Sequence, residues 1–174
     1  MFNPRVELFL VLANESGHRG APVRRLRWSD IDLDKRLVRW RAASDKGRWA
    51  HVTPLTDEAT ASLTAERART LAIGDAWIFP HGNDPSRPLT VHAARSMWKR
   101  LATRAGLPTG ERYGWHALRR RFATELKAEP LKDVCELGGW RNATTPLQSY
   151  QKRDEATQRA ALARRKKLGT GGLT

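Results

Sequence analysis

The sequence lacks several features that mark common classes of protein. Its single cysteine, Cys135, excludes an intramolecular disulfide and suits the reducing cytoplasm. No apolar run approaches the roughly 20 residues that span a bilayer, and the N-terminus has no cleavable signal pattern, so we expect a cytoplasmic protein with no membrane partner. The histidines lack the spacing of metal ligands, and no glycine-rich loop leads into a lysine. The sequence therefore indicates no metal, no cofactor and no nucleotide-driven reaction.

Acidic residues are also scarce relative to basic ones. The 174 residues include 18 Asp and Glu against 32 Lys and Arg, which gives a formal net charge of +14 and a sequence pI of about 11.1. Such an excess of positive charge predicts a polyanionic partner, of which nucleic acid is the most common. The length suits one domain that is large enough to bury a core.

The hydrophobic pattern predicts a single α+β domain that is mostly helical and contains a small three-stranded antiparallel sheet. Thr56 and Thr90 are placed to cap two of the helices, and Gly106 to end the second of them. The expected helices cover residues 4–15, 56–71, 90–105, 115–129, 131–137 and 154–168, with one helical turn within 144–150. The expected strands cover residues 28–31, 37–41 and 49–53.

A helix that begins near Gly114 carries the pair of residues with the clearest chemistry. His116 and Arg119 are three residues apart, so they share one face of the helix, one turn from each other. His116 falls in the first turn, where backbone N–H groups already favour an anion. A histidine and an arginine directed at one point near a helix start suit a phosphate oxygen. This pair alone leaves the alternative open that both lie on a solvated face of a basic helix.

A tyrosine downstream of this helix is the candidate nucleophile. Tyr150 and Tyr113 are the only tyrosines, and Tyr113 is so close to His116 that we interpret it as a packing residue. A phenol with a pKa of about 10 needs activation before it attacks phosphorus. His116 is the natural acceptor of the phenol proton, and Lys46, in the turn Ser-Asp-Lys-Gly at residues 44–47, is placed to protonate a leaving alkoxide.

Arginines and a tryptophan complete the candidate site. Arg19 follows Gly17 and His18, and it would join Arg119 in donating forked N–H groups to the non-bridging oxygens of a phosphate. Such donors act on charge that develops in the transition state. Trp140 ends the segment Leu-Gly-Gly-Trp and offers only an indole N–H, which suits a phosphate oxygen and excludes a role as a base; the alternative is a core tryptophan.

In this order along the chain, the segments resemble the catalytic domain of the tyrosine recombinases, the phage-integrase family. The resemblance runs roughly from residue 6 to residue 150. The motifs are Ser-Gly-His-Arg at 16–19, Leu-Arg-Trp-Ser-Asp-Ile-Asp at 26–32, Lys46 before Val-Thr-Pro-Leu at 52–55, His-Ala-Leu-Arg at 116–119, Leu-Gly-Gly-Trp at 137–140, and Tyr150.

The resemblance implies the tyrosine-recombinase catalytic-core fold and a site-specific recombinase or integrase. In this family the tyrosine attacks the scissile phosphate, forms a 3′-phosphotyrosyl link and frees a 5′-hydroxyl, without metal or ATP. The implied partners are double-stranded DNA and further copies of the protein in a DNA-bound synaptic tetramer, with DNA-bending accessory proteins left open. A bacterial or phage-encoded, nucleoid-associated protein is expected. Basic residues beside the motifs are read as contacts to the DNA backbone or as plain surface charge: Arg24, Arg25, Arg120 and Arg121.

The chain departs from the family pattern in its organisation and at single positions. We expect residues 1–174 to be one catalytic domain, with a basic helix at about 154–168 and a tail at 169–174, and without the usual N-terminal core-binding domain. Pro22 replaces an acidic residue that many relatives have, Trp140 stands where many carry His, and ten residues separate Trp140 from Tyr150. Two other functions stay open: a type IB topoisomerase-like enzyme, with a telomere resolvase as a variant, and a non-catalytic DNA-binding fragment.

Overall fold

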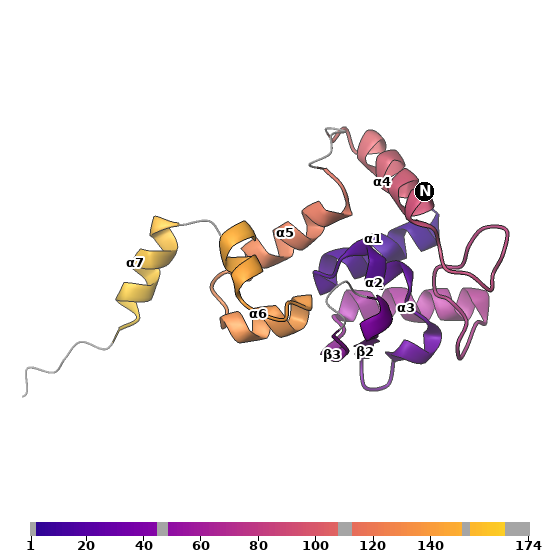
Figure 1. The fold of residues 1–174 in the computed structure, drawn as a ribbon, viewed down its shortest axis with the longest axis horizontal. Coiled ribbons are helices and arrows are strands. Elements are labelled where there is room, and N and C mark those ends of the chain that lie inside the picture. Colours follow the sequence, from indigo (N-terminus) through magenta and orange to yellow (C-terminus); the bar gives the residue numbers. More distant parts are fainter. Residues whose placement is uncertain (1–2, 45–48, 108–112, 151–153, 166–174) are drawn as a thin grey trace, which may run out of the picture.

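The structure is a computed structural model that describes residues 3–44, 49–107, 113–150 and 154–165, with the backbone alone for residues 149 and 150. Its helices and its antiparallel sheet confirm the predicted α+β class (Figure 1). The helices are α1 (Pro4–Ser16), α2 (Gly20–Arg24), α3 (Asp57–Thr70), α4 (Val91–Arg104), α5 (Trp115–Glu125), α6 (Leu131–Gly138) and α7 (Glu155–Ala163), with a π-helical turn at Pro146–Tyr150. The strands are β1 (Ile31–Asp32), β2 (Leu37–Trp40) and β3 (His51–Pro54).

Helix α1 is the centre of the core and packs between α3 and α5 (Figure 1). Asn3 caps its start, since the Asn3 side chain accepts the backbone N–H of Arg5 at 2.9 Å. Gly17 ends the helix with a φ of 63°, a left-handed conformation that favours glycine. The helix buries Leu8, Phe9, Leu12 and Ala13, whose spacing places them on one face.

Helices α3 and α4 begin at the threonines that the sequence indicates. The Thr56 hydroxyl accepts the backbone N–H of Ala59 at 3.2 Å, and the Thr90 hydroxyl accepts that of Ala93 at 3.0 Å. Each such cap stabilises its helix by about 1 kcal/mol. Gly106 follows α4 with a φ of 64°. Both helices therefore have the predicted starts, and their ends lie within a residue of the prediction.

The sheet has the predicted order of strands, but the first strand was misplaced. The strands pair antiparallel in the order β1-β2-β3, and the register places Trp40 opposite His51. The expected first strand at residues 28–31 is wrong, because Trp28–Asp30 forms a 3-10 turn and β1 begins only at Ile31. The cause is Asp30, whose carboxylate accepts the backbone N–H of Arg27 at 3.0 Å and closes the turn.

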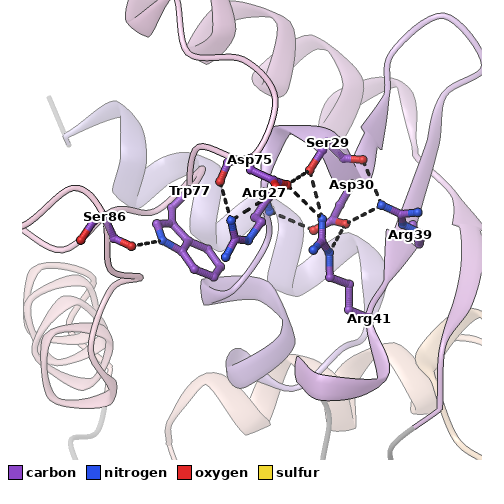
Figure 2. Close-up of polar contacts among 8 residues, drawn as sticks. All are labelled: Arg27, Ser29, Asp30, Arg39, Arg41, Asp75, Trp77 and Ser86. Atoms are coloured by element: carbon purple, nitrogen blue, oxygen red, sulfur yellow. Dashed lines mark hydrogen bonds and ion pairs between the residues drawn. The ribbon is translucent and has the colours of Figure 1, made fainter.

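A buried carboxylate joins this turn to β2 and to the segment that precedes Trp77 (Figure 2). Asp30 lies in the interior and accepts from Nε of Arg41 at 2.5 Å. Arg41 also reaches Asp75, and Arg27 donates to the Asp75 carbonyl at 2.8 Å while its guanidinium lies 3.8 Å from the Trp77 ring centre. The polar network therefore fixes the sheet against the rest of the domain.

Helix α7 buries none of its side chains and projects from the rest of the molecule (Figure 1). Asp154 caps it by accepting the backbone N–H of Ala156 at 3.0 Å, and it also pairs with Lys127 at the end of α5. The hydrogen bond from Lys127 is the main cause that lowers the pKa of Asp154 to about 2. The predicted helix at 154–168 is thus present over Glu155–Ala163, and residues 166–174 lie outside the described part. No helix in the described residues is long and apolar enough to cross a membrane.

Candidate functional site

Two glycines allow the segment that carries Arg19 to lie close to α5. A Cβ at Gly17 would lie 2.4 Å from the ring of Phe122, so no other residue fits this position without displacing that ring. A Cβ at Gly20 would lie 3.6 Å from the Cβ of Trp115, which shows how closely the start of α2 approaches the start of α5. Arg19 caps α2 at this contact and is partly buried. The motif glycines therefore place Arg19 beside the helix that carries His116.

Arg119 is buried where three segments of the chain meet. Only 1% of its surface is exposed, and its Nη1 donates to the carbonyl oxygen of Gly17 at 2.6 Å and to that of Gly138. Hydrogen bonds from a charged donor contribute about 1.5–3 kcal/mol each, which helps to offset the cost of taking the guanidinium out of water. These contacts fix the direction of the side chain before any ligand binds.

Trp140 covers Arg119 from the end of α6. The guanidinium carbon of Arg119 lies 3.7 Å from the centre of the Trp140 ring, a cation–π contact in a buried place. A Cβ at Gly138 would lie 1.8 Å from this ring, and Gly139 ends α6 with a φ of 67°. The Gly-Gly-Trp sequence is thus required for the ring to fold back onto Arg119. Trp140 is thus buried, as expected of a core tryptophan, and its contact with a phosphate oxygen stays a prediction.

His116 is the second residue of α5 and lies at the accessible edge of the site. Partial burial lowers its pKa, and the positive charges of Arg119, Arg120 and Arg19 lower it further. These charges come from α5 and from the start of α2, so the structure brings Arg19, His116 and Arg119 within electrostatic reach of one another. A lowered pKa keeps the imidazole neutral near pH 7, which is the form that accepts a proton.

Two of the predicted catalytic residues cannot be placed in full. Lys46 lies outside the described residues, so its position stays a prediction. The backbone of Tyr150 ends the π-helical turn Pro146–Tyr150, which contacts α5, and its side chain lies outside the described part. Pro146, at the start of that turn, is fully buried. The segment that bears Tyr150 is therefore packed on the helix of His116 and Arg119.

The arginines expected at the DNA backbone differ in accessibility. Arg24 is buried, and its Nη1 donates to the Leu89 carbonyl at 2.8 Å, so it joins α2 to the segment before α4. Burial is the main cause that lowers the pKa of Arg24, followed by the charge of Arg25. Arg25 and Arg120 are partly exposed, whereas Arg121 is exposed and forms an ion pair with Glu125 on its own helix. Arg24 is thus the least accessible of the four.

Several groups that build the site were not singled out from the sequence. The carbonyls of Gly17 and Gly138 hold Arg119, and the Phe122 ring packs where Gly17 has no side chain. Both glycines belong to the motifs quoted from the sequence, but the motifs do not show that the glycine carbonyls accept from Arg119. Among the described residues, no group of three or more His, Cys, Asp or Glu is arranged to hold a metal ion.

Comparisons with known proteins relate the chain to a family and to solved structures. The model of the family described as "Phage integrase family" matches residues 3–157. The integrase of Shigella phage Sf6 is 27% identical over 106 residues, which are 61% of this chain and 26% of that protein. The chain thus spans about a quarter of the length of this curated relative.

Solved recombinase structures share the fold. The crystal structure of XerA recombinase has a TM-score of 0.74 at 17% identity, covering 95% of this chain and 58% of that one. The XerH site-specific recombinase bound to its difH substrate has a TM-score of 0.69 at 24% identity, covering 92% of this chain and 46% of that one. At these identities the likeness is one of fold, and the match again covers only part of each solved chain.

Proposed function

This chain belongs to the phage integrase family, and we propose that it is the catalytic part of a tyrosine-type site-specific DNA recombinase. The observation that carries the proposal is Arg119, a buried guanidinium oriented by two backbone carbonyls and covered by the Trp140 ring. Burial of a charge is costly unless hydrogen bonds or an opposite charge compensate for the lost hydration, so a buried arginine is a candidate functional residue. Its neighbours Arg19 and His116 are the partners that a scissile phosphate needs.

The proposed reaction is a transfer of the DNA phosphate to Tyr150. Arg19 and Arg119 hold the non-bridging oxygens and stabilise the charge that builds on them. The Tyr150 oxygen forms a bond to phosphorus as the bond to the 5′-oxygen breaks, with His116 taking the phenol proton and Lys46 protonating the departing oxygen. Attack of a 5′-hydroxyl from a partner duplex reverses these steps and frees Tyr150. Because the phosphotyrosyl bond conserves the energy of the broken bond, the scheme uses neither ATP nor a metal.

Trp140 has a supporting role in this scheme. Its ring rests on the Arg119 guanidinium and limits the directions in which that group can point. Its indole N–H is a second candidate donor to a phosphate oxygen. We assign the phosphate contact first to Arg119 and Arg19.

Double-stranded DNA is the proposed substrate, and further copies of this protein are the proposed partners in a synaptic tetramer. The formal net charge of +14 supports the first part. The exposed, projecting α7 supports the second, since such a helix can pack on a neighbouring copy. DNA-bending accessory proteins stay an open part of the proposal.

The test is covalent trapping on a suicide substrate, a nicked duplex that loses its 5′-hydroxyl fragment on cleavage. Wild type, Tyr150→Phe and Tyr113→Phe are incubated in chelator with a random pool of such duplexes and separated on a denaturing gel. We expect a protein–DNA adduct from wild type and from Tyr113→Phe, and none from Tyr150→Phe. Tyr113 is the matched control, because it is the only other tyrosine in the sequence and is exposed, which corrects its interpretation as a packing residue.

Other outcomes identify the rival functions. An adduct accompanied by relaxation of supercoils without recombinant products would indicate topoisomerase-like chemistry. DNA binding without any adduct, even when a family core-binding domain is fused to the N-terminus, would contradict the proposal and leave a non-catalytic DNA-binding fragment.

A further inference from the structure

Two histidines, one of them the residue before Arg19, lie in contact with each other. His18 is 2% exposed, and its Nε2 lies 3.0 Å from Nε2 of His51 in β3. The Nδ1 of His18 lies 3.0 Å from the carbonyl oxygen of Ser16, so Nδ1 carries the proton and donates to that oxygen. The Nε2 of His18 then has a lone pair, and Nε2–H of His51 donates to it at 3.0 Å; the Nδ1 of His51 makes only a longer contact, 3.4 Å, with the carbonyl oxygen of Trp49. His51 is therefore the donor and His18 the acceptor in the hydrogen bond between the two rings.

Aromatic stacking holds both rings in place. The His18 ring stacks on Trp40 of β2 with centres 3.6 Å apart and 12° between the planes. The His51 ring stacks on Trp49 with centres 4.3 Å apart and the same 12° angle. A Cβ at Gly139 would lie 2.8 Å from Nε2 of His18 and 3.1 Å from Cε1 of His51, so the glycine leaves room for the contact.

We propose that His18 and His51 are positioning residues that tie the Arg19 segment to β3. The inference rests on the function proposed above. His18 precedes Arg19 in the chain, and β3 begins five residues after Lys46 in the sequence. A phosphate clamp and a general acid must act on different oxygens of one phosphate, so the segments that bear them need a fixed relation. The hydrogen bond between the two imidazoles supplies this link.

The link requires a neutral His18. The groups that face His18 are His51 from β3, Arg119 from α5 and the adjacent Arg19, and all of them are positive or can become so. Burial and the charge of His51 lower the pKa of His18 well below its ordinary value, the two arginines lower it further, and the Ser16 carbonyl opposes them. A protonated His18 would turn one N–H toward another across 3.0 Å. We therefore expect the link to hold near neutral pH and to break in acid.

The test compares His51→Leu, which removes the donor, with His51→Gln, whose side-chain amide can still donate to His18. With DNA at saturation, the rate of adduct formation should fall about tenfold in His51→Leu, the factor expected for one lost hydrogen bond of about 1.4 kcal/mol. His51→Gln should recover most of that rate. The dissociation constant for DNA should stay at the wild-type value in both variants, because neither residue is proposed to touch DNA. Equal rates in the two variants would overturn the proposal.

A second measurement does not depend on activity. Nitrogen-15 spectra of the imidazoles should show His18 as the neutral ring with a proton on Nδ1, and a proton on Nε2 at neutral pH would overturn the assignment. Amide hydrogen exchange at residues 17–20 should speed up in His51→Leu and stay near the wild-type rate in His51→Gln. If the wild type forms no adduct, the proposed function fails, whereas the exchange data still judge the link between His18 and His51: unchanged exchange in His51→Leu would contradict it.

Discussion

Two buried charged side chains, Asp30 and Arg119, are held in different ways. Asp30 faces opposite charge, since it accepts from Arg41 at 2.5 Å and lies 3.5 Å from Nη2 of Arg39 (Figure 2). Arg119 donates to the backbone carbonyls of Gly17 and Gly138, acceptors that orient the guanidinium but carry no net charge. The contacts of Asp30 match its negative charge with positive charge, and the contacts of Arg119 with the two carbonyls orient its guanidinium group.

The surroundings of the two groups show what the difference means. Burial is the main cause that lowers the pKa of His18 and of His116, and the positive charge of Arg119 adds to it at His116 on its own helix and at His18 on another segment. The contacts of Asp30 join a turn, β2 and the segment near Asp75, all of them parts of the scaffold. The two residues thus differ in their surroundings: Asp30 is matched by opposite charge in the scaffold, and Arg119 lies among titratable groups of the candidate site.

The largest expected effect follows from replacing Arg119 by Lys. Lysine keeps the charge but has a single nitrogen, whereas the guanidinium donates to both carbonyls through Nη1 and has two further nitrogens. We expect the rate of adduct formation to fall by about 10²–10³, the range for loss of one transition-state donor. Gel quantification of single-turnover cleavage measures the rate, and thermal unfolding of the same sample controls for the fold. A folded variant that cleaves at the wild-type rate would show that charge alone suffices.

Asp30→Asn should lower the stability of the protein and leave the rate of adduct formation unchanged. The amide keeps the shape of the carboxylate but removes the charge that faces Arg41 and Arg39. The free energy of unfolding should fall by roughly 1–3 kcal/mol, less than for a fully buried pair because both arginines are partly exposed to water. Urea denaturation measures this loss. The rate of adduct formation per folded molecule should stay unchanged, and a selective loss of activity would erase the contrast with Arg119.

Acidic pH should lower the free energy of unfolding through His18. His18 has a lowered pKa in the folded protein, so the unfolded chain binds more protons just below the ordinary value of 6.5. The free energy of unfolding should therefore decrease as the pH falls below 6.5, by at most about 1.4 kcal/mol per pH unit for this one group. The difference in pH dependence between wild type and His18→Leu isolates the contribution. Identical pH dependence would mean that His18 does not titrate as proposed.

The smallest expected effect separates two neighbouring arginines. The charge of Arg120 reaches His116, whereas Arg121 forms an ion pair with Glu125 at 2.7 Å on the exposed face of α5. If Arg120 neutralises a DNA phosphate, Arg120→Gln should reduce the slope of log affinity against log salt by about 1. Arg121→Gln should change it less. Fluorescence anisotropy over a salt series measures both slopes, and equal changes would remove the distinction.

Local patterns in the sequence were sufficient for most of the secondary structure. Thr56, Thr90 and Gly106 act through contacts within a few residues, so their positions predicted the helices correctly. The strand expected at residues 28–31 was wrong because Asp30 closes a turn with its own side chain. Alternating apolar residues do not reveal such a competing hydrogen bond.

The site was only partly predictable, because its contacts join distant segments. The spacing of His116 and Arg119 predicted one helix face, and the structure bears out a shared helix with Arg19 near its start. The two residues differ in accessibility, since Arg119 is buried whereas His116 lies at the accessible edge of the site. The contact of His18 with His51 spans 33 residues and depends on how the sheet meets α6, which no local pattern encodes.

The most direct test of the central claim is whether Arg119 acts on the charge of the scissile phosphate. Adduct formation by wild type and Arg119→Gln is measured on a duplex selected from the random pool, and on the same duplex with a neutral methylphosphonate at the scissile position. Glutamine removes the charge and is two bonds shorter than arginine, so the comparison of the two substrates within each protein separates the loss of charge from the loss of packing. We predict a defect on the ordinary phosphate that shrinks by about tenfold or more on the neutral substrate, where there is less charge to stabilise. An equal defect on both substrates would contradict the account and leave Arg119 as a structural residue.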